Sequence, residues 1–162
     1  MGLDIAFWIL AVVCVVGALA VVILPNVFRA ALSLVLCFLA IAGIYIALSA
    51  DFLAAVQVLV YVGGISVLII MAVMLTRGVQ QGSTFNKLGL PALLVAILFL
   101  GVLVISMVNT PWVISGTAPI APTTSALADK LLGKGGFILP LEIGAVLLLA
   151  AILGAIVMVR EK

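Results

Sequence analysis

The chain has 162 residues, of which 68% are hydrophobic and only 7% charged, and its formal net charge is +2. A typical soluble domain is about 45–50% apolar and about 25% charged, so these few ionised groups cannot cover the surface of a soluble globule. The small, dispersed charge excludes a nucleic-acid-binding surface, and a mean hydropathy of +1.61 excludes a disordered chain. The composition predicts an integral membrane protein.

The residues that usually carry chemistry are scarce. The chain has no histidine, which is the commonest metal ligand and general base. Cys14 and Cys37 stand alone in long apolar runs and cannot build a Cys-rich zinc or iron–sulfur site within this chain. They are interpreted as small buried hydrophobes, and the functional alternative is a redox pair or metal site. No glycine-rich phosphate loop or Gly-x-Ser-x-Gly motif is present. We therefore expect this chain to bind no metal or cofactor, and any redox centres to lie in other subunits.

Charged residues divide the chain into apolar runs. No Asp, Glu, Lys or Arg occurs within residues 5–28, 30–50 or 52–76, and two further apolar runs come after them. A membrane helix needs about 20 apolar residues, so each run fits one crossing, and long runs without alternation indicate helices rather than a barrel. We expect an all-α integral membrane protein whose five transmembrane helices form a single membrane domain, residues 1–162. The predicted spans are 4–24, 27–49, 52–76, 89–108 and 137–159.

The segment between the fourth and fifth spans is different. Residues 109–136 are rich in Pro, Thr, Ser and Gly, which predicts a surface loop, with a short amphipathic helix at 125–132 that ends at Gly133. Asp51 lies between the second and third apolar runs, and we expect its side chain to cap the N-terminus of the third helix.

The distribution of Lys and Arg predicts the orientation. One side of the membrane receives five basic residues and the other receives two, together with three acids. Because basic residues favour the cytoplasmic side, we place the N-terminus outside, the C-terminus in the cytoplasm and loop 109–136 in the periplasm. The five are Arg29, Arg77, Lys87, Arg160 and Lys162; the others are Lys130, Lys134, Asp4, Asp51 and Asp129.

The third span holds the candidate functional residues. Gln57 and Tyr61 are four residues apart and share one helical face, whereas α-helical spacing puts Ser66 to the side of it. Polar groups at this depth should face protein or water. Gly63 and Gly64 lie mid-span and lower the cost of leaving α-helical geometry, so we expect a π-bulge or kink there, with close helix packing as the plainer alternative.

The fifth span contains the one carboxylate inside an apolar run. Glu142 is a candidate proton-carrying group, although its place in the first turns of the helix also suits an interfacial anchor. Small residues spaced four apart, at Ala150–Gly154 and Ala151–Ala155, suit tight packing against a neighbouring helix. They suggest a chain embedded in a larger bundle.

These residues resemble one family. The segment DFLAAVQVLVYVGGISVLIIMAVML is similar to the third helix of the J-type membrane subunit of proton-pumping NADH:quinone oxidoreductase, respiratory complex I. The shared pattern is Gln-x-x-x-Tyr-x-Gly-(Ala/Gly)-Ile, from Gln57 to Ile65. The segment FILPLEIGAVLLLAAILGAIVMVR resembles the last helix of that family, including Pro140 and Glu142. Gly64 stands where many relatives have Ala.

The resemblance implies a function for the third span. It implies a non-redox subunit of an H⁺-translocating oxidoreductase, in which a π-bulge at the Tyr-Gly segment converts to regular helix and gates a water path. That path would involve Gln57, Tyr61, Gly63, Gly64 and Ser66. FMN, iron–sulfur clusters and quinone would lie in partner subunits. The expected partners are the small A-, H- and K-type subunits, the antiporter-like subunits and lipid, in the inner (plasma) membrane of a prokaryotic cell.

Two alternatives stay open. One is a small secondary transporter or proton exchanger that uses Glu142; such a protein would work alone or as a homodimer, whereas a complex subunit migrates with a large assembly. The other is a purely structural assembly subunit, which differs only in that the third span does not move.

Overall fold

The structure is a computed structural model that describes residues 2–76, 89–112 and 123–160, and within these ranges every regular element is helical. The third span is continuous but is divided by a π-helical segment, η1, into three parts. The elements are α1 (Gly2–Ile23), α2 (Val27–Ala47), α3 (Asp51–Val56), η1 (Gln57–Ile65), α4 (Ser66–Leu75), α5 (Gly89–Asn109), α6 (Thr123–Leu132) and α7 (Ile138–Val159).

Within the described ranges, five helices are long and apolar enough to cross a membrane, which confirms the predicted number. They are α1, α2, the combined helix Asp51–Leu75, α5 and α7. Their ends differ from the predicted spans by no more than two residues. The amphipathic helix predicted at 125–132 is α6, which begins two residues earlier.

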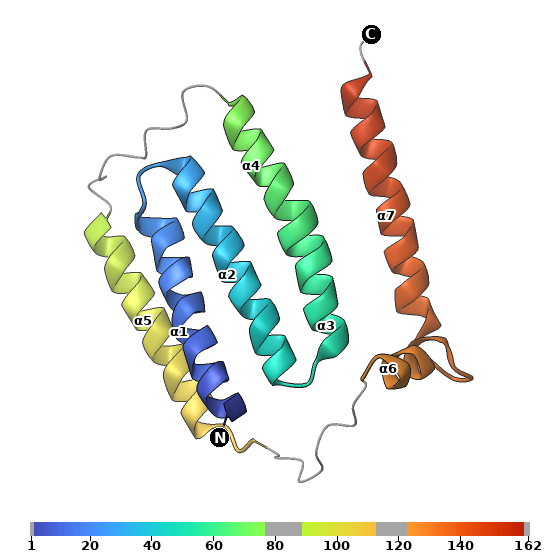
Figure 1. Ribbon diagram of the computed structural model, residues 1–162, viewed down its shortest axis with the longest axis horizontal. Coiled ribbons are helices and arrows are strands. Elements are labelled where there is room, and N and C mark those ends of the chain that lie inside the picture. Colours follow the sequence, from blue (N-terminus) through green and yellow to red (C-terminus); the bar gives the residue numbers. More distant parts are fainter. Residues whose placement is uncertain (1, 77–88, 113–122, 161–162) are drawn as a thin grey trace.

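Successive spans run in opposite directions, and the marked N- and C-terminal ends lie at opposite ends of the molecule (Figure 1). Helix α2 packs against α1 on one side and against α3, η1 and α4 on the other. Helix α6 lies across one end and contacts α3 and α7. Within the described ranges, neither α5 nor α7 packs against this three-span bundle.

The turn between the second and third spans differs in one detail from expectation. Ser49 adopts a positive φ of 58°, and Ala50 precedes the third span without a side-chain cap. Asp51 is therefore the first helical residue and not the N-cap, so the prediction of capping was wrong. Its carboxylate still lies in the first turn, where the helix dipole favours an acid. At the start of α2, by contrast, the Asn26 side chain accepts hydrogen bonds from two backbone N–H groups.

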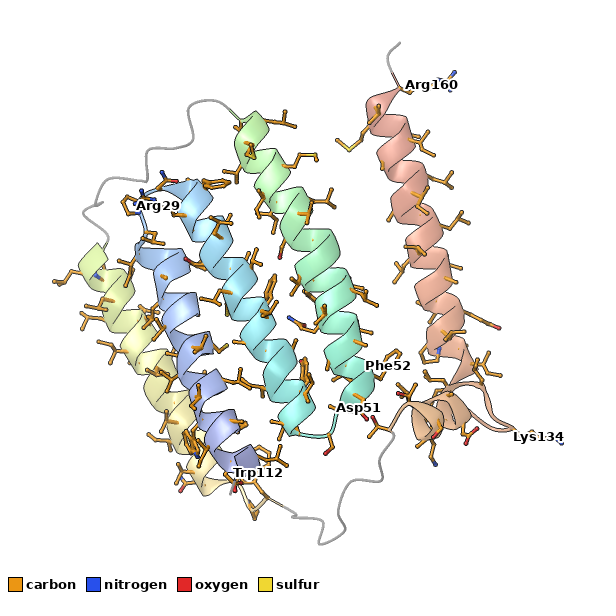
Figure 2. All side chains as sticks on the ribbon, viewed as in Figure 1. Arg29, Asp51, Phe52, Trp112, Lys134 and Arg160 are labelled. Carbon is orange, nitrogen blue, oxygen red and sulfur yellow. The ribbon has the colours of Figure 1, made fainter. Side chains whose placement is uncertain are left out.

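Charged side chains mark the two ends of the bundle. Arg29 and Arg160 lie at one end, and Asp51 and Lys134 lie at the other (Figure 2). This arrangement is what membrane crossings require, because a charge in the middle of the hydrocarbon is costly. Three of the basic residues used to predict the orientation, Arg77, Lys87 and Lys162, lie outside the described residues.

Small residues form the core between α1 and α2. A Cβ added at Gly17 would stand 3.3 Å from the Cβ and 3.4 Å from the Cα of Cys37, so the two backbones approach closely there. A Cβ at Gly43 would meet only the flexible end of Leu10, at 2.9 Å. Close approach through small residues drives helix association in membranes, because lipid removes the usual hydrophobic driving force.

Helices α5 and α7 keep their apolar surface uncovered. None of the most apolar window of either helix is buried. Gly154, in the small-residue pattern of α7, has no atom within 4 Å of a Cβ placed on it. Such continuous apolar surface requires lipid or further membrane helices as neighbours.

We predict that Gly17→Val destabilises the α1–α2 pair, because the added methyl groups would push against the α2 backbone. Overpacking of this kind costs about 1–3 kcal/mol. Unfolding of the purified chain in mixed micelles measures the loss. The matched control is Gly101→Val, at a position with no atom within 4 Å of an added Cβ. Equal stability of the two variants would contradict the packing described here.

Candidate functional site in the third span

The predicted departure from α-helical geometry is present as a π-helix over Gln57–Ile65. At its end, the backbone N–H of Ser66 donates to the carbonyl of Tyr61, five residues back. An α-helix would pair the Ser66 N–H with Val62 instead. In hydrocarbon a backbone group without a partner costs several kcal/mol, and the five-residue register keeps these groups paired while the helix widens.

Ser66 reinforces this register with its side chain. Its hydroxyl donates to the same Tyr61 carbonyl at 2.7 Å, and the residue is only 2% exposed. The expectation that Ser66 lies to the side of the Tyr61 face assumed α-helical spacing, which does not apply across a π segment. A serine hydroxyl in an α-helix bonds the carbonyl three or four residues back, so this bond distinguishes the two geometries.

Two side chains hold the π segment against α2. The Gln57 side-chain amide is buried and its Nε2 donates to the carbonyl of Phe38 at 3.4 Å. One turn further, the Tyr61 ring packs edge-on against the Phe38 ring, with centroids 5.6 Å apart at 72°. Both contacts fall on a single residue of α2. Phe38 is therefore the support of the π segment, and no signal in the sequence identified it.

Gly63 and Gly64 face away from this support. A Cβ on Gly63 would lie 3.4 Å from the carbonyl oxygen of Val58, and one on Gly64 would lie 3.8 Å from that of Leu59. Both oxygens belong to the π segment itself, and nothing from another described helix comes within 4 Å. The glycines therefore do not serve close helix packing among the described residues. Their outer surface is open, and the five predicted residues divide into a face toward α2 and an outer face.

Glu142 stands apart from these residues. It lies in the second turn of α7 and is exposed, and α7 does not contact α3, η1 or α4 within the described chain. The described structure thus does not bring the carboxylate together with the π segment. Figure 1 shows α7 separated from the third span, with α6 between their lower ends.

The two cysteines lie together, although the sequence suggested that each stands alone. Their Sγ atoms are 3.7 Å from each other, across the contact between α1 and α2. No spacing rule within one helix could have found this pair, because 23 residues separate them. Among the described residues, no group of three or more His, Cys, Asp or Glu side chains could hold a metal ion.

We predict that Ser66→Ala weakens the π segment locally. Loss of one buried hydrogen bond costs about 1 kcal/mol, which raises amide exchange about fivefold where local opening controls it. Hydrogen–deuterium exchange over residues 61–70 measures this. Ser33→Ala is the matched control, because that hydroxyl makes an ordinary bond to Arg29, four residues back and at 3.0 Å. Unchanged exchange in Ser66→Ala would contradict the role given to its hydroxyl.

Comparison of the amino-acid sequence with known proteins identifies the family of this chain. Residues 17–158 match the family described as NADH-ubiquinone/plastoquinone oxidoreductase chain 6. F(420)H(2) dehydrogenase subunit J of Methanosarcina mazei is 40% identical, over 96% of this chain and 90% of its own. NAD(P)H-quinone oxidoreductase chain 6 of Synechocystis sp. is 40% identical, over 97% and 80%. The chloroplastic NAD(P)H-quinone oxidoreductase subunit 6 of Chlorokybus atmophyticus is 39% identical, over 91% and 78%. The chain belongs to the NADH-ubiquinone/plastoquinone oxidoreductase chain 6 family.

Proposed function

We propose that this chain is a membrane-arm subunit of a proton-translocating NADH:quinone oxidoreductase, in which the third span couples quinone reduction to proton transfer by changing its helical register. The observation that carries the proposal is the π segment Gln57–Ile65, fixed to α2 on one face and open at its glycines on the other. Such a segment can exchange the π register for the α register while its backbone groups stay paired.

The two registers orient the helix beyond the π segment differently. Conversion from π to α turns the residues after Ile65 by roughly 100°, the angle of one residue in an α-helix. The Ser66 hydroxyl would exchange the carbonyl of Tyr61 for that of Val62. The apolar side chains of α4 would rotate with it, and they would enter or leave a file of water beside the span. A small or polar lining supports such a file, and on the exposed outer face Gly63 and Gly64 supply small residues.

The electron-transfer chemistry belongs to partner subunits in this proposal. FMN, iron–sulfur clusters and quinone are held elsewhere, and the A-, H- and K-type and antiporter-like subunits cover the apolar faces of α5 and α7. The open surfaces of these two helices support that role. The names of the relatives include NAD(P)H and F(420)H(2) as donors, which fits a subunit that does not itself contact the donor.

The proposed location is the inner membrane of a prokaryotic cell, with the N-terminus outside and the C-terminus in the cytoplasm. The five-to-two distribution of Lys and Arg in the sequence supports this orientation, because basic residues favour the cytoplasmic side, and Arg29 and Arg160 lie at the same end of the structure. Loop 109–136, which includes α6, would then face the periplasm.

We predict that Gly63→Val and Gly64→Val impair proton pumping in the assembled complex. In the π form, a β-branched side chain at Gly63 would crowd the carbonyl of Val58, which an added Cβ already reaches at 3.4 Å. A cost of about 1 kcal/mol shifts a two-state equilibrium about fivefold. Proton pumping and quinone reduction are measured together in membrane vesicles, and protons moved per quinone reduced should fall.

The smaller Gly63→Ala should have a weaker effect, because its Cβ makes an ordinary contact. Gly101→Val in α5 is the matched control, and native electrophoresis checks that each variant assembles. A purely structural subunit would lose assembly without a change in the pumping ratio of the complexes that form. Full pumping and full turnover in both valine variants would contradict the gating proposal.

A further inference from the structure

The thiols of Cys14 in α1 and Cys37 in α2 form a pair at mid-helix. Their Sγ atoms are 3.7 Å apart, and the Cys37 Sγ lies 3.6 Å from the backbone carbonyl of Cys14. Both thiols are free, and Cys37 is buried. These are the only two cysteines of the chain. The fold therefore builds an isolated dithiol between two membrane helices.

The backbones of α1 and α2 approach closely beside this pair. Gly17, one turn beyond Cys14, brings the two helices together, since a Cβ placed on it would stand 3.4 Å from the Cα of Cys37. In a disulfide the sulfurs are about 2.0 Å apart, so these sulfurs must approach by about 1.7 Å from their 3.7 Å separation. Rotation of the two cysteine side chains is the movement that closure requires.

The hydrocarbon around the two thiols limits the reactions that they can undergo. Both thiols lie near the centre of apolar helices, where a charged product is costly. A structural zinc site needs four ligands, and no third Cys, His or carboxylate ligand joins the pair within the described residues. A copper(I) bis-thiolate would carry a net negative charge. A disulfide is neutral and needs no further ligand.

We propose that Cys14 and Cys37 are a redox-modifiable site that closes to an intramolecular disulfide, with a lipid-soluble quinone as the oxidant. Both S–H bonds break and one S–S bond forms. The two electrons and two protons released reduce the quinone to quinol, so the reaction balances without another reactant. The site is distinct from the third span and does not depend on its proposed movement.

A disulfide between Cys14 and Cys37 would affect the third span, because Cys37 lies next to the residue that contacts it. Cys37 directly precedes Phe38, whose carbonyl accepts from Gln57 and whose ring packs against Tyr61. A disulfide would fix α2 to α1 at the level where α2 supports the π segment. Oxidation would thus restrict the movement of α2 on the side opposite the third span, next to Phe38.

The test uses membranes that contain the assembled protein. They are treated with decylubiquinone, and in parallel with copper–phenanthroline in air, which oxidises dithiols to disulfides. The protein is then denatured and alkylated with N-ethylmaleimide, and the mass of the intact chain is measured by mass spectrometry. We expect both alkylation sites to be lost together, the intact chain to be lighter by two hydrogen atoms, and dithiothreitol to restore both thiols.

The matched control moves one thiol along the same helix. Cys14→Ser combined with Val12→Cys places it on the outer face of α1, where Val12 is 60% exposed. This variant should retain two alkylatable thiols within each chain. No closure of the parent with either reagent would overturn the site. Closure with copper alone would overturn the quinone as its oxidant, and equal closure of parent and control would overturn the contact as its cause.

Discussion

Within a bilayer, each backbone N–H and C=O group must find its partner inside the protein, and this constraint governs the third span. A kink that freed even one pair of groups would cost several kcal/mol in hydrocarbon. The π-helix over Gln57–Ile65 avoids that cost, because each N–H in the wider turn bonds five residues back instead of four. The helix can therefore change register by exchanging partners instead of losing them.

Helix α2 contacts both α1 and the third span, so it is the element that would hold the third span in place during the proposed change of register. It contacts α1 through closely approaching backbones at Gly17 and Cys37, and it contacts the third span through Phe38. Gln57 and Tyr61 fix the first half of the π segment, whereas Ser66 marks its end. In the proposed switch, the half held by Gln57 and Tyr61 is the anchor, and the half that carries the exposed glycines is the part that turns.

The charge pattern was enough to predict the five helices, because a charge within the hydrocarbon is costly and all but one of the charged residues lie near the ends of a crossing or in loops. The glycine pair predicted a departure from α-helical geometry, and the structure contains one. The bond from the Ser66 hydroxyl to the Tyr61 carbonyl could not be predicted, since the sequence argument assumed the α-helical period throughout. The Phe38 support and the cysteine pair depend on how α2 meets its neighbours, and periodicity within one helix carries no information on that.

The arrangement of the candidate site residues could be predicted from the sequence only in part. The sequence marked Glu142 as the only acid within a span, but it gave no indication that α7 stands apart from the bundle. Family resemblance grouped Gln57, Tyr61, Gly63, Gly64 and Ser66, and only the structure divides them into a face held by α2 and an open face. This division gives the sequence pattern a physical arrangement, with one face in contact with α2 and one face exposed.

The central claim is that the third span exchanges its backbone register during turnover. Electron cryomicroscopy of the assembled complex, frozen at rest and during steady quinone reduction, tests it most directly. The partner of the Ser66 N–H is the readout. We predict particles with the bond to Tyr61 and, during turnover, a second population with the bond to Val62. A third span that keeps the Tyr61 register in every turnover state would contradict the claim.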